Sequence, residues 1–173
     1  IQVCPVPTAV LSAHTGYSEF VMRDLTDFMK PALEHYKKMD MKFDCVYSGF
    51  LASSEQIDHC LEFFEAFPDA LKVVDPVMGD GGKAYKTYTK VNLADGGMST
   101  VGYDKENNSF WKIKNDYVPA HYSGTGDMFT SVLIGGLLKG DSLPIAMNRA
   151  TAFTELTVKT TYSYQTPWTD GLM

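Results

Sequence analysis

A short loop at residues 123–127, Ser-Gly-Thr-Gly-Asp, contains the residue types that handling a phosphate group requires. The apolar stretch that follows predicts a helix over 125–139, closed by Gly140. The first N–H groups of a helix have no partner inside it, and together with the helix dipole they favour an anion at that end. Asp127 lies among these groups and could accept a proton from an alcohol while they hold a transferring phosphoryl group.

A purely structural explanation of this loop is also open. An aspartate in the first turn of a helix is favourable because of the helix dipole alone, and short Gly-x-Gly patterns are common. The loop is not a P-loop, because the pattern GxxxxGK[ST] is absent. It is not a dinucleotide-binding fingerprint either, because it follows a predicted hairpin and not the first strand of a βαβ unit.

Two further aspartates follow a predicted buried strand. The sequence Val-Val-Asp-Pro-Val-Met-Gly-Asp-Gly-Gly at 73–82 places Asp75 at the end of that strand and Asp80 in a glycine-rich loop. Ligands bind at the carboxyl ends of strands in open α/β sheets, and two carboxylates there suit Mg²⁺ held against phosphates. Asp75 taken alone is explained equally well as a strand-terminal residue that caps a turn.

A third polar group follows the first predicted strand. The sequence Ser-Ala-His-Thr-Gly-Tyr at 12–17 brings His14, Thr15 and Tyr17 to the end of that strand, where they could face the same crevice as the aspartates. A neutral histidine beside a threonine suits hydrogen bonding to, and stacking on, a heteroaromatic ring. On its own, His14 is explained more simply as an ordinary loop histidine.

The first half of the chain alternates predicted strands and helices. Apolar and β-branched residues predict a strand within 1–11, whose Pro5 and Pro7 favour a sheet edge. Helical spacing over 24–39 is interrupted by Pro31, where we expect a break and a second helix. The next predicted elements are a strand at 43–50, a helix, and a strand at 70–76. Ser53 or Ser54 is the expected cap of that helix. Its apolar stripe is predicted at Ile57, Leu61, Phe64 and Phe67. This alternation predicts a parallel α/β sheet.

The second half begins with a stretch, from Pro76 to about Gly97, in which no element is convincing. A structureless loop of that length is unusual inside a compact domain. Beyond it, residues flanking 105–108 predict a β-hairpin. The remaining predictions are the helix over 125–139, a helix over 143–160 with apolar positions Ile145, Ala146, Ala150, Phe153, Leu156 and Val158, and no clear element in the tail at 162–173.

Composition limits the classes of protein that need to be considered. The 173 residues are 45% hydrophobic, which suits one globular domain spanning 1–173. A net charge of −6, from 15 basic and 21 acidic side chains, argues against a nucleic-acid-binding surface. Three widely spaced cysteines argue against a disulfide framework and a zinc site, and Cys45 and Cys60 are predicted to be core thiols. We expect a cytoplasmic protein with no membrane span and no signal peptide.

Together the three polar groups resemble the pyridoxal kinase branch of the ribokinase-like family. The resemblance covers nearly the whole chain in the same order. It rests on Val-Pro-Thr-Ala-Val-Leu-Ser-Ala-His-Thr-Gly-Tyr at 6–17, Tyr-Ser-Gly-Phe-Leu at 47–51, Val-Val-Asp-Pro-Val-Met-Gly-Asp-Gly-Gly-Lys-Ala-Tyr at 73–85, and Ser-Gly-Thr-Gly-Asp-Met-Phe at 123–129. The 73–85 and 123–129 motifs are those of vitamin kinases in general, and the segment at 12–17 is similar to pyridoxal kinases in particular.

The resemblance implies phosphorylation of the 5′-hydroxymethyl group of pyridoxal, pyridoxamine or pyridoxine, with ATP and Mg²⁺, in a homodimer; a requirement for K⁺ stays open. It implies a three-layer α/β/α fold with a mainly parallel central sheet and an antiparallel hairpin. Asp127 is then the base. The resemblance also implies an anion hole at Gly124, Thr125, Gly126 and Asp127, with Thr125 also beside ATP. Asp75 and Asp80 would lie on the Mg-phosphate side, and Tyr85 in a loop over ATP. The implied vitamin pocket is lined by Ala9, Leu11, His14, Thr15 and Phe50.

This chain departs from the family pattern in three respects. Family members have an earlier N-terminal strand with a substrate-contacting serine, and a Thr-Pro-Asn-type strand end between the 73–85 motif and the hairpin. Here Thr89-Lys90 passes directly to Val91-Asn92. We therefore expect that the chain lacks some segments or belongs to a longer protein. Leu11 and Phe50 stand where pyridoxal kinases commonly have Phe and Tyr, which leaves the preferred vitamer open.

Three alternatives stand beside this interpretation. The nearest keeps the chemistry but takes hydroxymethylpyrimidine, the thiamin precursor, as the acceptor; that branch often has Cys where this chain has Asp127. A second is a non-catalytic protein that binds pyridoxal phosphate. A third is an incomplete, inactive fragment that keeps the motifs without assembling them.

Overall fold

The computed structural model describes residues 2–14, 17, 19–75, 79–80, 83–84 and 99–173. The chain divides into two compact units, Ile1–Lys86 and Thr87–Met173, and each is treated by itself below. Among the described residues, no helix combines the length and the apolar character that crossing a bilayer requires.

The first unit contains the predicted parallel strand pair. The strands β3 (Cys45–Ser48) and β4 (Leu71–Val74) pair in parallel, with Cys45 opposite Leu71 and Ser48 opposite Val74. The helix α2 (Ser54–Ala66) connects them, so this part is a βαβ unit as the alternation of elements predicted. Ser53 is its N-cap and accepts a hydrogen bond from the backbone N–H of Gln56, as expected.

The first strand pairs differently from the sequence prediction. Only β1 (Ala9–Leu11) forms within 1–11, and its described partner is the antiparallel strand β2 (Met22–Asp24), which the sequence did not indicate. Two prolines at 5 and 7 keep the segment before β1 from donating to a ladder, because proline has no N–H group. Two further short strands, β5 (Gly79–Asp80) and β6 (Lys83–Ala84), pair with each other.

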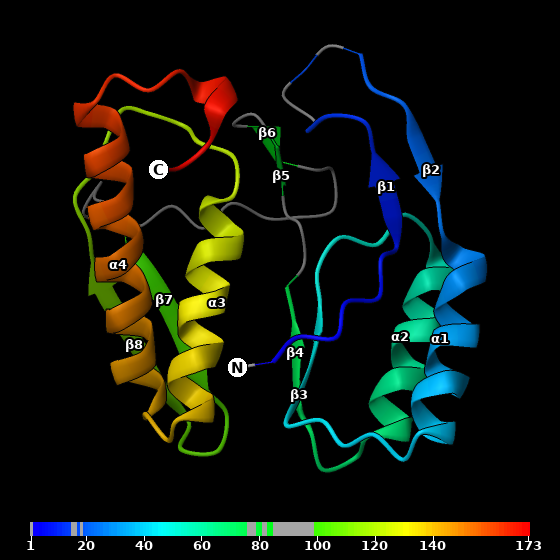
Figure 1. Ribbon diagram of the computed structural model, residues 1–173. Helices are drawn as coiled ribbons and strands as arrows, with labels where there is room; N and C mark the ends of the chain where they lie inside the picture. The colour runs from blue at the N-terminus through cyan, green and yellow to red at the C-terminus, as the bar shows by residue number, and fades with distance from the viewer. Residues whose placement is uncertain (1, 15–16, 18, 76–78, 81–82, 85–98) are drawn as a thin grey trace. The chain divides into compact units, whose positions relative to one another are not determined.

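The predicted break at Pro31 is wrong. The helix α1 runs without interruption over Thr26–Lys38, with Pro31 inside it. A proline there removes one intrahelical hydrogen bond, but buried side chains on both sides hold the helix together: Met29 is 2% exposed and Leu33 is 3% exposed. Figure 1 shows α1 and α2 lying side by side as the two helices of this unit.

The core of the first unit lies between these helices and the parallel strand pair. Its buried members are Leu33, Phe63, Phe67 and Ala70. The rings of Phe43 and Phe67 meet edge to face with centroids 4.8 Å apart, a favourable aromatic geometry.

The buried face of α2 differs from the predicted apolar stripe. Phe67 is buried as expected, but Ile57 and Leu61 are about half exposed, at 50% and 51%. Phe63 and the polar Gln56 are buried instead. The apolar residues of α2 occupy more than one face, so their spacing alone could not decide which face meets α1.

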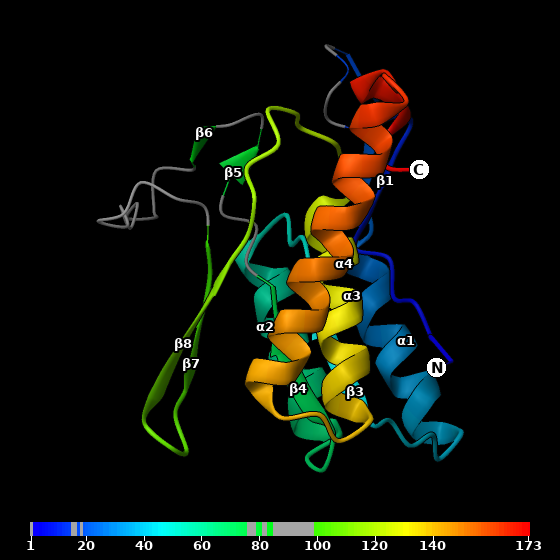
Figure 2. The same cartoon turned by 90° about the vertical axis from the view of Figure 1, so that its left-hand side faces the viewer.

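The second unit begins with the predicted hairpin. The strands β7 (Ser99–Asp104) and β8 (Ser109–Lys114) pair antiparallel, with Ser99 opposite Lys114. Figure 2 shows them running side by side to the turn that joins them. The carboxylate of Asp104 accepts the backbone N–H groups of Glu106 and Asn107 within that turn, a local arrangement that aspartate favours.

Two helices complete the second unit. The helix α3 spans Thr125–Leu138, close to the predicted 125–139, and Gly140 follows it with φ of 91°, the left-handed conformation expected after a helix end. The helix α4 spans Leu143–Ser163, three residues beyond the predicted end, and a short 3₁₀ helix, η1 (Trp168–Asp170), lies in the tail.

Small residues bring α3 and α4 close together. Ala146 and Ala150 are 0% exposed, as their predicted apolar role requires, whereas Ile145, Phe153 and Leu156 are 49%, 49% and 64% exposed. A Cβ on Gly136 would lie 3.1 Å from the Cβ of Ala146 and 3.0 Å from a carboxylate oxygen of Asp141. The helices therefore approach too closely at this point for a larger side chain.

The cysteines behave as thiols, consistent with the absence of a disulfide framework. Cys4, Cys45 and Cys60 are free and half-buried. Burial raises the pKa of the Cys45 and Cys60 thiols, which keeps both protonated and unreactive at neutral pH.

The close approach of α3 and α4 predicts a cost for enlarging Gly136. Gly136→Val should lower the free energy of unfolding by about 1–3 kcal/mol, because the added methyl groups must displace Ala146 or Asp141. Ala152→Val, at an exposed position of α4, introduces the same β-branching without this contact and is the control. Urea denaturation followed by circular dichroism measures both; equal losses in the two variants would contradict the packing explanation.

Candidate active site

The loop at 123–127 turns at Gly124 and delivers Asp127 into the first turn of α3. Gly124 has φ of 88° and ψ of −3°, a left-handed conformation that glycine adopts without strain. Its carbonyl oxygen accepts the first bond of the helix, from the N–H of Met128 at 2.9 Å. The N–H groups of the three residues between them therefore have no partner within the helix, and the exposed carboxylate of Asp127 lies on the last of these residues.

The side chain of Thr125 fixes the loop to the residue before it. Its hydroxyl donates to the carbonyl oxygen of Tyr122 at 2.7 Å. Tyr122 is only 5% exposed, and its own hydroxyl reaches the carbonyl of Thr166 at 3.5 Å. A Cβ on Gly171 would lie 3.7 Å from the carbonyl oxygen of Ser123. The C-terminal tail thus supports the loop, a role that the sequence pattern of the tail gave no reason to expect.

The two glycines of the loop differ in what they allow. Gly124 is required for conformation, because its positive φ strains any residue with a side chain. Gly126 has no such backbone requirement, and a Cβ there would meet no atom of the described part of its unit within 4 Å. Within the described part of its unit, the space beside Gly126 is therefore open.

Asp75 lies at the carboxyl end of the parallel strand pair in the first unit. Its N–H donates to the carbonyl oxygen of Ser48 at 2.9 Å, extending the ladder of β3 and β4 by one bond. Its carboxylate accepts a hydrogen bond of 2.9 Å from the hydroxyl of Tyr47, on the adjacent strand. Asp75 lies at the strand end where the sequence predicted it, but its contact with Tyr47 had no sequence signal, because the two residues are neighbours only across the strand pair.

The described residues contain no group of three or more His, Cys, Asp or Glu side chains arranged to hold a metal ion. Asp75 is a carboxylate of the kind that Mg²⁺ prefers, and the backbone of Asp80 pairs with Lys83 in the β5–β6 ribbon. Tyr85, predicted to cover ATP, lies outside the described residues. A magnesium site built from Asp75 and Asp80 therefore stays a prediction.

The residues expected to line a vitamin pocket come from two segments of the first unit. Ala9 and Leu11 are partly buried, while Val10 between them is 56% exposed, so the two lie on one face of β1. Phe50, in the loop after β3, is linked to this strand because the hydroxyl of Thr8 donates to its carbonyl oxygen at 3.0 Å. The structure thus brings Phe50 to the start of β1.

His14 lies in a turn beyond β1. The N–H of Tyr17 donates to its carbonyl oxygen at 3.1 Å, and the two rings lie with centroids 4.7 Å apart. Thr15, predicted to act beside His14, lies outside the described residues. The structure thus brings the rings of His14 and Tyr17 together, and stacking of His14 on a heteroaromatic ligand stays a prediction.

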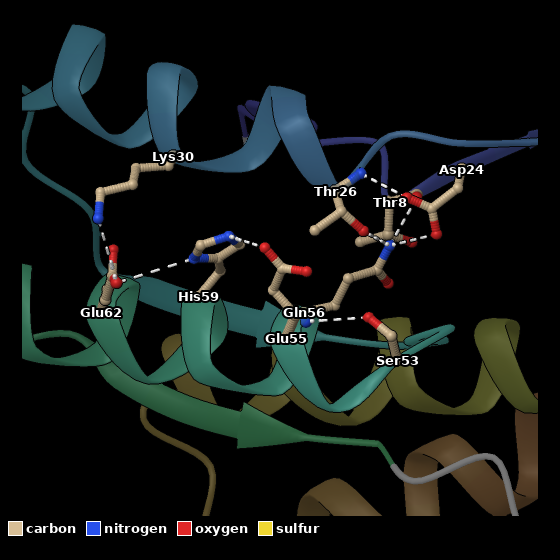
Figure 3. Close-up of polar contacts among 9 residues, drawn as sticks. All are labelled: Thr8, Asp24, Thr26, Lys30, Ser53, Glu55, Gln56, His59 and Glu62. Atoms are coloured by element: carbon tan, nitrogen blue, oxygen red, sulfur yellow. Dashed lines mark hydrogen bonds and ion pairs between the residues drawn. The ribbon is translucent and has the colours of Figure 1, made fainter.

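A buried amide connects the segments that carry these residues. Gln56, in the first turn of α2, is 0% exposed and bonds to Thr8, Asp24, Thr26 and Ala52. Figure 3 shows its bonds to the first three of these residues. Hydrogen bonds from the side chain and backbone of Thr26 lower the pKa of the Asp24 carboxyl, so that it remains an acceptor at neutral pH. The sequence did contain one signal of this role, since Ser53-x-x-Gln56 has the form of a capping box.

Comparison with known proteins identifies structural relatives. No protein-family model and no curated protein sequence matches the chain. A protein from Bacteroides thetaiotaomicron described as a phosphomethylpyrimidine kinase is 33% identical, with a TM-score of 0.90, over 99% of this chain and 81% of that one. Another crystal form of it, described with pyridoxal, has a TM-score of 0.87 at 33% identity, over 99% of this chain and 82% of that one.

A more distant match is pyridoxal kinase from Lactobacillus plantarum, with a TM-score of 0.80 and 21% identity over 96% of this chain and 81% of that one. At this identity the similarity shows a shared fold. The predicted α/β fold of the ribokinase-like type is therefore confirmed.

The difference between the two loop glycines gives a test of the loop geometry. Gly124→Ala should lower the free energy of unfolding by about 1–2 kcal/mol, because an alanine must adopt the left-handed conformation there. Gly126→Ala should not lower it, since Ala forms helix better than Gly and its Cβ would meet no described atom of its unit. Urea denaturation of both variants measures the difference; an equal loss in both would contradict the geometry of the loop.

Proposed function

The chain belongs to the ribokinase-like family of pyridoxal and phosphomethylpyrimidine kinases, and we propose that it uses ATP to phosphorylate the 5′-hydroxymethyl group of a B6 vitamer. The observation that carries this proposal is the turn at Gly124, after which Asp127 lies beside N–H groups that have no partner within α3. An acceptor for a proton and donors for a phosphoryl group then occupy a single helical turn.

The transfer itself needs little covalent chemistry from the protein. The hydroxyl oxygen of the vitamer attacks the γ-phosphorus of ATP, the bond to the β–γ bridging oxygen breaks, ADP leaves, and the hydroxyl proton passes to Asp127. The transition state of such transfers is loose in most analyses, with negative charge spread over the phosphoryl oxygens. The N–H groups of Gly126 and Asp127 would stabilise that charge, and the hydroxyl of Thr125, already bound to Tyr122, would hold them in place.

The residues at the end of β4 fit a phosphate-bound Mg²⁺. Such an ion is usually held by one or two carboxylates together with phosphates and water, so it needs no cluster of three protein ligands. We propose that Asp75, oriented by Tyr47, supplies one of these carboxylates and Asp80 another. When bound, Mg²⁺ supplies positive charge that neutralises the phosphates.

The vitamin ring is proposed to lie among Ala9, Leu11, His14, Thr15 and Phe50. An apolar face of β1, a half-exposed aromatic ring and a histidine together suit a flat heteroaromatic ring with polar substituents. Support for a B6 vitamer comes from the Ser-x-His-Thr-Gly-Tyr segment at 12–17 and from the Bacteroides relative, which is described with pyridoxal.

Hydroxymethylpyrimidine is the second candidate acceptor, because the same Bacteroides relative is described as a phosphomethylpyrimidine kinase. The two alcohols share a hydroxymethyl group on a six-membered heteroaromatic ring, so Asp127 would serve either. The two alcohols differ in their ring nitrogens and substituents. The residues of the vitamin pocket would therefore have to discriminate between the two rings.

The kinase proposal is tested by ATP-dependent phosphate transfer to pyridoxal, pyridoxamine and hydroxymethylpyrimidine, each offered separately. We expect turnover with a B6 vitamer, and we expect Asp127→Asn to lower kcat by about 10²–10⁴-fold with little change in KM, because the amide cannot accept the proton. Near-normal turnover in Asp127→Asn would remove the residue from its role. Tight binding of a vitamer without ATP consumption would favour a non-catalytic binding protein.

A second test concerns the open space beside Gly126. Gly126→Ala should lower kcat/KM by about tenfold or more, because its methyl group would stand where the phosphoryl oxygens approach the N–H groups. The loss should appear without a loss of stability, which distinguishes it from Gly124→Ala. Unchanged kcat/KM in Gly126→Ala would mean that the helix start does not bind the transferring group.

A further inference from the structure

The Gln56 side chain satisfies its hydrogen-bonding groups entirely within the first unit. Its Nε2 atom donates to the hydroxyl oxygen of Thr26 at 2.9 Å, to the carbonyl oxygen of Thr8 at 3.0 Å and to the carboxylate of Asp24 at 3.3 Å. Its Oε1 atom accepts the N–H of Ala52 at 2.8 Å. An amide buried to 0% exposure is costly unless its partners are in place, so each partner is held at a defined position.

Those partners belong to four different segments. Thr8 immediately precedes β1, Asp24 ends β2 and Thr26 begins α1 (Figure 3). Ala52 lies in the loop between β3 and α2. The carbonyl oxygen of Thr8 accepts a second hydrogen bond from the N–H of Leu25 at 3.0 Å. Two donors therefore fix the backbone at the point where β1 begins.

Thr8 extends this fixed arrangement to Phe50 through its hydroxyl. The bond from its Oγ1 atom to the carbonyl oxygen of Phe50 joins residues 42 positions apart in the sequence. Phe50 itself is 49% exposed, so packing can hold its ring only in part. The hydrogen bond to its backbone and the anchoring of Ala52, two residues later, by Gln56 hold this segment as well.

We infer that Thr8 is a positioning residue that sets the spacing between β1 and Phe50, and thereby the affinity of the site for the ring of the acceptor alcohol. The inference rests on the proposed function, because Ala9, Leu11 and Phe50 are taken to line the vitamin pocket. It assigns to the Thr8 hydroxyl an effect on the acceptor and none on ATP; Gln56 holds the backbone of Thr8 in place. A residue that only stabilised the fold would change both substrates' constants together, or neither.

The test uses Thr8→Val, which keeps the shape of the side chain and removes the hydroxyl. We expect KM for the vitamer to rise about fivefold to tenfold, the effect of losing one neutral hydrogen bond. KM for ATP and kcat should stay within about twofold of wild type. Thr8→Ser retains the hydroxyl and should restore a KM close to that of wild type. Thr8 is half-buried, so these variants should fold; Thr8→Ala provides a second way to remove the hydroxyl.

Thr26→Val is the matched control. It makes the same chemical change at another partner of Gln56, but Thr26 does not bond to Phe50. We expect a lower melting temperature, because Gln56 loses one partner, and no change in KM for the vitamer. An equal rise in vitamer KM in Thr8→Val and Thr26→Val, or an equal rise in KM for ATP, would overturn the inference, since either would indicate a general loosening of the unit.

Failure of the inference and failure of the proposed function give different results. If wild type turns over a vitamer and Thr8→Val has an unchanged KM, the inference alone is wrong. If wild type binds pyridoxal without turnover, the same comparison is made with its dissociation constant, measured from the absorbance of the pyridoxal ring. If wild type neither binds nor phosphorylates any of the three alcohols, both the proposed function and the inference are wrong.

Discussion

A primary amide buried away from water must find all of its hydrogen-bonding partners within the protein, and in the first unit this constraint falls on Gln56. Its partners lie on four separate segments, so their relative positions are determined together and not one by one. Apolar packing between α1 and α2 supplies the bulk of the core, but it is not directional. The hydrogen bonds of the amide are directional and orient the four segments relative to one another. These segments lie next to the residues proposed to contact the substrate.

In the second unit the notable feature is the start of α3, whose first backbone N–H groups have no partner within the helix. The exposed Asp127, which follows the turn at Gly124, carries one of these groups. The bond from Thr125 to Tyr122 and the support of the C-terminal tail keep this turn in place. Contacts with Tyr122 and the tail hold the start of α3, while no described atom of its unit fills the space beside Gly126. Such an arrangement suits a reaction whose transition state is stabilised mainly by correct positioning.

Tyr47 and Asp75 show how the parallel strand pair orients a carboxylate. The carboxylate lies where a strand ends, and a hydroxyl on the neighbouring strand orients it. A carboxylate held in this way would lose little freedom on binding the cation proposed for it. The carboxyl ends of strands are the place where open α/β sheets commonly bind ligands.

The sequence by itself determined features that depend on neighbours along the chain. The cap at Ser53, the parallel pair joined by α2, the hairpin around 105–108 and the start of α3 after Gly124 all follow from local patterns, and so do the motifs that carry the kinase resemblance. Only the tertiary structure decided that β1 pairs with β2, that α1 continues through Pro31, and that α2 buries Gln56 where Ile57 and Leu61 were expected. It also decided that Thr8 reaches Phe50 and Tyr47 reaches Asp75. The physical reason is the same in each case: the partner that stabilises the residue lies far away in the sequence, and periodicity or capping patterns carry no information about a partner that folding alone brings near.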